Sequence, residues 1–392
     1  MRIYFILFIS LLVASCSSDN EANDKEPKET VEVVVDEPDS TAYYDSLYKP
    51  YHFHLDTFFR SRFKSRSFNG SVLFARKGNV IFKENYGLAN VKTRDTITFE
   101  HTFQLASASK PITAIAALQL YEQGKIRLTD DIKKYIPEVP YEGITIHQLL
   151  SHRSGMSQYT HFCDAPDSIW PDKHQTIHNI DVIKIMKDIV PMINYAPDVK
   201  FYYCNTNYML LATLVEKVSG LPFREYLKEH IFDVAGMPNT RLYERDNDSL
   251  LVKPAKGYNG AYNPTIDIYL NGVVGDKGIY SNTADMLALD KALFKGELIH
   301  DSLVQRMITP MSKNFKVNQN YGYGFRMFPE TEYGKLVYHS GWWKGFRSNF
   351  IHVLDTDECI IWLSNIKRGK HMNAIDLKSL LVSVDQIVQV KN

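Results

Sequence analysis

An apolar segment that begins at Pro111 most constrains how this chain can fold. Ile112, residues 114–118 and Leu120 are apolar, so the segment predicts a helix with almost no polar face. Such a helix needs protein around it on every side. A chain of 392 residues, 44% of them hydrophobic, is long enough to supply that cover. We therefore expect one large globular unit built around this helix.

Ser107 and Lys110 form a Ser-x-x-Lys pair where this helix starts. Three residues make about one helical turn, so the Lys110 ammonium is expected beside the Ser107 hydroxyl. A serine hydroxyl is a weak nucleophile until a neighbour takes its proton, and a desolvated lysine can help to do so. Free N–H groups and the positive end of the helix dipole would favour a developing oxyanion. The pair predicts acyl transfer; alone, it could equally be a helix cap with a surface lysine.

Two later segments carry polar groups beside apolar runs. Tyr203 and Asn205 flank Cys204 immediately before a second apolar helix. His339 and Gly341 stand in an aromatic, β-rich run, where a glycine lets a ligand lie against the backbone.

In this order the three motifs resemble those of the serine β-lactamase and DD-peptidase superfamily, in its class C branch. The resemblance covers about residues 68 to 365 and includes the sequences of residues 144–156, 207–237 and 278–289. It implies an α+β fold, in which helices flank an antiparallel sheet and the active site lies in the cleft beside a mostly helical insert.

The coarse pattern of the chain agrees with that fold. Helical patterns dominate from Lys110 to about Leu242, and strand patterns stand on both sides of them, which suggests one antiparallel sheet made from both ends of the chain. We assign the sheet to about residues 49–116 and 260–392 and the helical region to about residues 117–259, all within one hydrolase domain of residues 49–392. The predicted strands are 71–75, 80–86, 348–354 and 359–364, and the last helix is 372–389.

The resemblance also implies catalytic roles. Ser107 would be the nucleophile, and Lys110 and Tyr203 would share the work of taking its proton and passing it to the leaving group. The backbone N–H groups of Ser107 and Trp342 would form the oxyanion hole.

Four residues would hold the substrate. Asn205 would bind its acyl-side carbonyl and orient Lys110, and Gly341 and Trp342 would line its path along the strand. His339 would take the place where relatives bind a substrate carboxylate or support the catalytic tyrosine. The structural alternatives are a helix cap for Asn205 and an ordinary strand histidine for His339.

Three departures from the family pattern narrow the expected activity. His339 stands where β-lactamases usually have lysine, Cys204 where serine is commonest, and Asp198 where glycine is frequent. Histidine occurs in carboxypeptidase, D-aminopeptidase and esterase branches. We expect a serine hydrolase that forms an acyl-enzyme at Ser107 on a D-amino-acid peptide, peptidoglycan-derived peptides included, or on a small ester, with β-lactams less favoured. The alternative is an inactive envelope binding protein, which a serine-directed probe would leave unlabelled.

The N-terminus predicts export. Arg2 precedes an apolar run over residues 3–13, which is too short to span a bilayer, and the next residues resemble a lipobox ending at Cys16. We expect a signal peptide over residues 1–15, lipidation of Cys16 and an acidic flexible tether over residues 16–48. The expected location is the cell envelope, anchored in the outer membrane and facing the periplasm or the cell surface.

Other partners are not expected. The formal charge is zero and no dense basic run occurs, so nucleic acid is not predicted. No histidine pair has a clear third ligand, and no phosphate-binding loop occurs, so neither a metal nor a cofactor is expected. The cysteines that remain after Cys16 are odd in number: Cys163, Cys204 and Cys359. The sequence does not decide whether Cys163 and Cys204 form a disulfide.

Overall fold

The computed structural model describes residues 40–164, 172–243, 251–260, 262–312, 320–367, 369 and 372–390. The chain divides into two units, residues 1–43 and 44–392, and the second holds all the elements discussed below apart from the first residues of α1. The predicted signal peptide, Cys16 and the tether up to residue 39 lie outside the described residues. Within the described ranges, no helix is long and apolar enough to cross a membrane.

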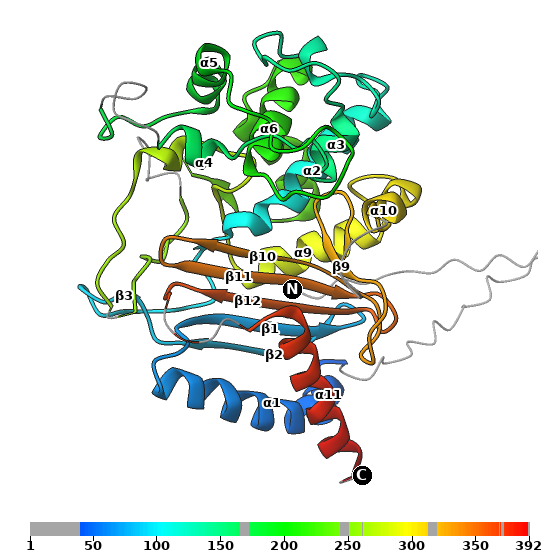
Figure 1. Ribbon diagram of the computed structural model, residues 1–392. Helices are drawn as coiled ribbons and strands as arrows, with labels where there is room; N and C mark the ends of the chain where they lie inside the picture. Colours follow the sequence, from blue (N-terminus) through cyan, green and yellow to red (C-terminus); the bar gives the residue numbers. More distant parts are fainter. Residues whose placement is uncertain are drawn as a thin grey trace, which may run out of the picture. The chain divides into compact units, whose positions relative to one another are not determined.

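A seven-stranded antiparallel sheet is the centre of the larger unit (Figure 1). Its order, β2-β1-β12-β11-β10-β9-β8, places the first hairpin beside the last strands. The prediction of one sheet built from both ends of the chain is therefore confirmed. The strands are β1 (Gly70–Arg76), β2 (Asn79–Tyr86), β8 (Asn320–Tyr321), β9 (Arg326–Phe328), β10 (Leu336–Trp343), β11 (Phe346–Val353) and β12 (Glu358–Ser364).

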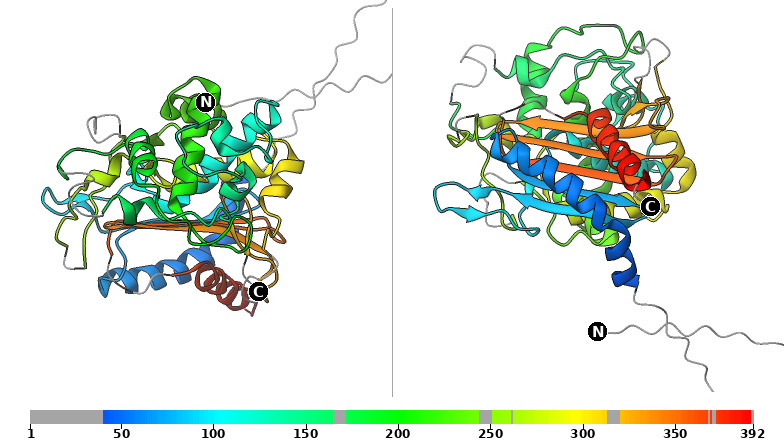
Figure 2. Two further views of the ribbon diagram at one scale, coloured as in Figure 1. Left: turned by 45° about the horizontal axis from the view of Figure 1, so that its top comes forward. Right: turned by 90° about the horizontal axis from the view of Figure 1, so that it is seen from below.

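Two helices from opposite ends of the chain cover one face of this sheet, as the edge-on view shows (Figure 2). They are α1 (Ser40–Lys64) and α11 (Ala374–Val390). Leu55 and Phe59 of α1, one turn apart, pack with Trp362 of β12 and Leu377 of α11 in a buried cluster. The sequence analysis placed residues 40–48 in a flexible tether, whereas the structure includes them in α1.

The remaining helices lie over the other face and beyond it. Those from α2 to α8 match the predicted helical patterns from Lys110 to about Leu242, although the short strand β6 also falls within that range, whereas α9 and α10 lie in the range 260–392 that was assigned to the sheet. The helices are α2 (Lys110–Glu122), α3 (Ile146–Leu150), α4 (Tyr159–Phe162), α5 (Asn179–Ile189), α6 (Asn205–Ser219), α7 (Phe223–Leu227), a π-helical turn (Lys228–Phe232), α8 (Asp233–Ala235), α9 (Thr283–Phe294), α10 (Asp301–Met307) and 3₁₀ turns at Ala106–Ser109, Ile132–Lys134 and Tyr269–Gly272. Two small sheets pair β3 (Leu88–Asn90) with β4 (Asp95–Thr96), and β7 (Ile279–Ser281) with both β5 (Phe103–Gln104) and β6 (Arg241–Leu242).

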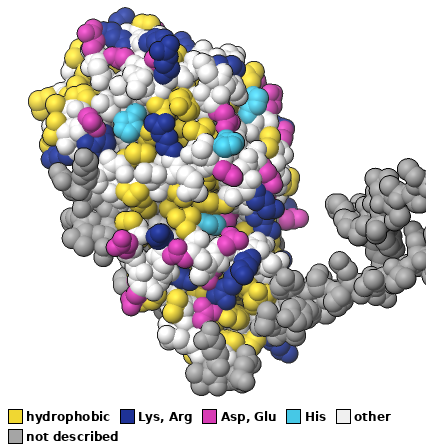
Figure 3. Space-filling view, turned by 90° about the vertical axis from the view of Figure 1, so that its right-hand side faces the viewer, with side chains coloured by type: hydrophobic (Ala, Val, Ile, Leu, Met, Phe, Trp, Pro, Cys, Tyr) yellow, Lys and Arg dark blue, Asp and Glu magenta, His cyan; other side chains and the backbone are white. Residues whose placement is uncertain are grey.

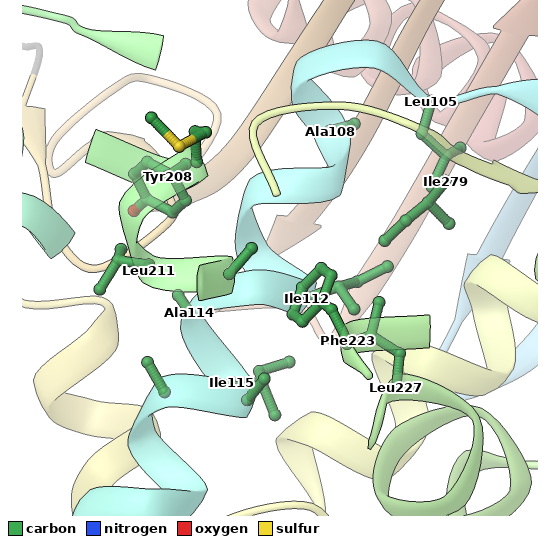
Figure 4. Close-up of a cluster of buried hydrophobic side chains, with 14 of the residues drawn as sticks. Leu105, Ala108, Ile112, Ala114, Ile115, Tyr208, Leu211, Phe223, Leu227 and Ile279 are labelled. Atoms are coloured by element: carbon green, nitrogen blue, oxygen red, sulfur yellow. The ribbon is translucent and has the colours of Figure 1, made fainter. Parts of the chain in front are cut away.

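Helix α2 is the buried element that the sequence predicts. Every residue from Lys110 to Leu120 is buried. Figure 4 shows Ile112, Ala114 and Ile115 of α2 among side chains from α6, α7 and β7. Burying a side chain of this size contributes roughly 1.5–3 kcal/mol, so this contact fixes the position of the turn that precedes α2.

Charges of both signs are interspersed on the face shown in Figure 3, with apolar side chains between them. A surface mixed in this way does not concentrate a field of one sign.

Candidate active site

Ser107 lies in the 3₁₀ turn Ala106–Ser109, between β5 and α2. Ala106 takes a left-handed φ of 50°, a conformation that is uncommon for a residue with a Cβ. The chain therefore turns sharply just before Ser107. The Ser107 side chain is half-buried, whereas its neighbours Ala106 and Ala108 are buried.

Lys110 meets the Ser107 hydroxyl as the spacing predicts. Its Nζ donates to Ser107 Oγ at 3.1 Å and to the carbonyl oxygen of Asp276 at 2.9 Å. The side chain is 0% exposed, and Nζ lies 4.9 Å from the centroid of the Tyr203 ring and 5.7 Å from that of Tyr208. A dry ammonium in contact with a half-buried hydroxyl is suited to proton transfer.

Tyr203 and Asn205 are held by Gln158, which the sequence analysis did not single out. Its Nε2 donates to the Tyr203 carbonyl at 2.6 Å, and its Oε1 accepts from the Asn205 N–H at 2.8 Å. The His152 ring packs against the Tyr203 ring with centroids 4.4 Å apart. One amide thus fixes both ends of the Tyr-x-Asn motif.

The Asn205 side chain does not orient Lys110 in the way predicted. Its Oδ1 is buried without a hydrogen-bond partner, and no hydrogen bond joins Asn205 to Lys110 in the part of the chain that the structure describes. The Asp276 carbonyl takes that place. The unpartnered amide oxygen can accept a bond from a ligand, because leaving it buried and unpaired costs about 1–3 kcal/mol.

His339 is buried inside the site. It is 1% exposed; Nδ1 donates to the Ser340 carbonyl at 2.8 Å and Nε2 accepts from the Tyr321 hydroxyl at 3.2 Å. Burial holds the pKa of His339 well below its usual range, and the positive charges of Arg326 and Lys110 lower it further. The imidazole is therefore neutral with both nitrogens occupied, so of its two predicted roles carboxylate binding is not supported. Its ring lies 6.1 Å from that of Tyr203.

Arg326 supplies the positive charge that His339 lacks. Its guanidinium lies 4.8 Å from the centroid of the Tyr203 ring and 5.9 Å from that of Tyr321. The sequence analysis missed Arg326 because its place depends on the pairing of β9 with β10, where Arg326 lies opposite Tyr338.

Gly341 lets β10 approach the serine turn. A Cβ at this position would lie 2.0 Å from the Leu105 carbonyl oxygen and 3.1 Å from the Ala106 Cβ. Strand β9 pairs only with residues 336–338, so within the described residues 339–343 of β10 have no strand on that side. This open edge includes Trp342, which is 53% exposed.

A cavity of about 140 Å³ lies at the end of β10, beside Trp343. Gln104, three residues before the serine, lines it, and its Oε1 is buried with no hydrogen-bond partner among the described residues. Trp343 Nε1 donates to Asn271 Oδ1 at 2.7 Å and closes one side. The cavity has room for a small substituent.

The two other departures from the family pattern have local reasons. Asp198 takes a left-handed φ of 65°, a conformation that glycine adopts readily. Arg153 Nε donates to Asp198 Oδ1 at 2.5 Å. Burial raises the pKa of Cys204 to about 11, so this residue is a neutral packing thiol. Cys163, Cys204 and Cys359 are free and buried.

The described residues include no group of three histidine, cysteine or acidic side chains arranged to hold a metal ion.

Comparisons with known proteins agree with this geometry. Residues 55–382 match the family model described as Beta-lactamase. Penicillin-binding protein 4* of Bacillus subtilis (strain 168) is 31% identical over 344 residues, which cover 83% of this chain and 74% of that protein. A D-aminopeptidase of Brucella anthropi is 26% identical over 82% of this chain and 61% of its own length. The crystal structure of a penicillin-binding protein from Bacillus halodurans superposes with a TM-score of 0.70 at 24% identity, over 84% of this chain and 98% of that one.

Proposed function

The chain belongs to the Beta-lactamase family and is a serine hydrolase that acts on amide substrates, and from this premise we propose that Ser107 forms the acyl-enzyme on D-amino-acid amides or peptides. The observation that carries the proposal is the contact of 3.1 Å between the buried Lys110 Nζ and Ser107 Oγ. The relative that is a D-aminopeptidase supports the substrate class.

The reaction proceeds in two halves. Ser107 Oγ attacks the carbonyl carbon of the amide, and its proton passes to Lys110 and Tyr203, which return a proton to the amine as the C–N bond breaks. Water then attacks the acyl-enzyme ester and releases the carboxylic acid and Ser107. The N–H groups of Ser107 and Trp342 stabilise the oxyanion, and Asn205 Oδ1 accepts from an N–H of the substrate.

In this proposal, two further features select the substrate. The cavity beside Trp343 takes the acyl-side substituent, and its volume of about 140 Å³ favours a small one. Arg326, near Tyr203, faces the leaving side and binds a carboxylate there when the substrate carries one.

A labelling and turnover experiment tests the function. The full chain is treated with a fluorophosphonate and analysed by mass spectrometry, then assayed on D-alanine p-nitroanilide, D-alanyl-D-alanine peptides, p-nitrophenyl acetate and a chromogenic cephalosporin. We expect an adduct on Ser107 and faster turnover of the D-amino-acid substrates than of the cephalosporin. A chain that is folded but neither labelled nor active would instead be a binding protein.

The same panel tests Arg326. Replacing Arg326 by methionine is expected to lower kcat/KM for D-alanyl-D-alanine peptides about 10–100-fold, since a bond to a charged group contributes about 1.5–3 kcal/mol. Hydrolysis of D-alanine p-nitroanilide, whose leaving group has no carboxylate, should change little. Arg326→Lys keeps the charge, so its kcat/KM for D-alanyl-D-alanine peptides should lie between that of the wild type and that of Arg326→Met. Equal losses of kcat/KM on both substrates would show that Arg326 does not bind the carboxylate.

We further propose that Cys16 is lipidated and that residues 16–39 tether the enzyme to the cell envelope, in the outer membrane. Support comes from the lipobox-like wording before Cys16 and from the acidic composition that follows it.

Cys16→Ala is expected to move the protein from the membrane fraction to the soluble fraction, or to leave it unprocessed. Each buried methylene of a lipid chain contributes about 0.8 kcal/mol, and an acidic tether has no attraction for anionic lipid. Ser17→Ala is the matched control and should stay in the membrane fraction. Membrane recovery of the cysteine variant equal to that of the control would end the lipoprotein interpretation.

A further inference from the structure

A second buried ammonium, that of Lys277, lies behind the catalytic lysine. Lys277 is 2% exposed, and its Nζ donates to the Tyr159 hydroxyl and to the Val273 carbonyl, each at 2.7 Å. The Asp276 carboxylate lies 3.7 Å from it. Burying a charge is costly, and neither the motifs nor the mechanism above uses this one.

Asp276 connects the two lysines. Its carboxylate accepts from the Tyr159 hydroxyl at 3.0 Å, and that hydroxyl in turn accepts from Lys277. Its backbone carbonyl accepts from Lys110 at 2.9 Å. The side chain of one residue is therefore bound to Lys277, through Tyr159, while its main chain is bound to Lys110.

The turn that carries Asp276 can take few other positions. Gly275 and Gly278 have φ values of 102° and 103°, and a Cβ on Gly275 would lie 2.3 Å from the Tyr208 carbonyl oxygen. Thr113 of α2 donates to the Gly275 carbonyl at 2.7 Å. The bond from Lys277 to Val273 closes the same turn, so the direction of the Asp276 carbonyl follows from where Lys277 is held.

The charges of the two lysines also act on each other. Burial lowers the pKa of Lys277 to about 8, against the opposing effect of the Asp276 carboxylate, and the charge of Lys110 lowers it further. In general, a positive charge near a base favours the unprotonated form of that base.

We propose that Lys277 is a positioning residue for Lys110. By fixing Asp276 it keeps one N–H of Lys110 engaged by the Asp276 carbonyl, so that the lone pair of the unprotonated amine points to Ser107. Its positive charge also lies behind the base, where such a charge favours the unprotonated form. This inference rests on the proposed function, because it concerns the base that serves Ser107.

Other charged and titratable groups also face Lys110. Tyr203, Cys204 and Tyr208 precede or belong to α6, and His152 follows α3. His339 lies on β10 and Arg326 on β9. The pKa of His152 and of His339 is held well below the usual range, chiefly by burial, so both are neutral at working pH. A change confined to Lys277 leaves all of them in place.

The test compares three variants of the full chain on D-alanine p-nitroanilide between pH 5 and pH 10. In Lys277→Met a positive charge behind the base is gone, and such a charge favours the unprotonated form of a base, so the acid limb of the kcat/KM profile should move up by about one pH unit. We expect kcat at pH 7 to fall about 10–100-fold with little change in KM. Lys277→Arg keeps the charge and should keep the limb within about 0.3 units of wild type.

Tyr159→Phe keeps the charge but cuts the link to Asp276. This variant should lower kcat without moving the acid limb of the kcat/KM profile. It therefore tests the positioning role of Lys277 even if Lys277→Met does not fold. Lys295→Met, a charge removed from the exposed end of α9, is the matched control and should match wild type throughout.

Two results would overturn the inference. One is a folded Lys277→Met protein with the wild-type profile. The other is a loss that is equal at every pH and is shared by Lys277→Arg, since that pattern reports damaged packing alone. Failure of the proposed function is distinct, because wild-type protein would then take up no fluorophosphonate.

Discussion

Replacing Ser107 by alanine is expected to abolish turnover and fluorophosphonate labelling while the protein stays folded. Loss of the nucleophile of a serine hydrolase lowers kcat by a factor on the order of 10⁶. The stability cost is small, because in the described part of the chain the half-buried hydroxyl makes one side-chain hydrogen bond, to Lys110, and a bond of this kind contributes about 0.5–2 kcal/mol. Initial rates on D-alanine p-nitroanilide, the mass of the treated protein and thermal unfolding measure the three effects.

Ser109 offers a matched control two residues away. It is buried, and its hydroxyl accepts from the Ile279 N–H at 3.4 Å rather than contacting Lys110. Ser109→Ala should therefore keep labelling. If the Ser107 variant hydrolysed substrate at more than about a thousandth of the wild-type rate, another residue would be the nucleophile.

Lys110→Met is expected to lower kcat/KM by about 10²–10⁴, the range that a positioned proton-transfer group supplies. Methionine has a similar length and suits the buried position, so most of the loss reflects chemistry. It leaves the Asp276 carbonyl without its donor, at a cost of about 1–3 kcal/mol in the free energy of unfolding. Steady-state kinetics and urea unfolding separate the two effects.

An exposed lysine provides the comparison for this variant. Lys134 pairs with Asp130 on the surface, and Lys134→Met should change kcat/KM less than twofold. A Lys110 variant with the same rate as the Lys134 variant would leave proton transfer to Tyr203 alone.

Local patterns predicted the parts of the fold that depend on neighbouring residues. Alternation and turn residues located β1, β2, β11 and β12 to within two residues, and the apolar run after Pro111 located α2. Helix α1 was missed because its buried side chains, such as Leu55 and Phe59, stand among exposed charged and aromatic ones, so only its docking on the sheet identifies it.

The sequence likewise predicted those parts of the site that depend on neighbouring residues. Ser107 and Lys110 are one turn apart in the sequence, so their contact follows from helix geometry alone. Gln158, Asp276 and Arg326 reach the site through loops and through the β9 and β10 register, and no short pattern marks them. His339 lies on β10 with its ring centroid 6.1 Å from that of Tyr203, but its role depends on Tyr321 and on burial, which a motif cannot show.

The pairing of β1 with β12 sets the order in which the enzyme can mature. The Ser-x-x-Lys turn leaves the ribosome early, yet β10, which packs against that turn, and β12, which pairs with β1, are synthesised much later. Contacts between such distant segments form slowly, because a long loop must close first. A nascent chain therefore carries an unassembled and inert serine until β10 and β12 have been synthesised and have joined the sheet.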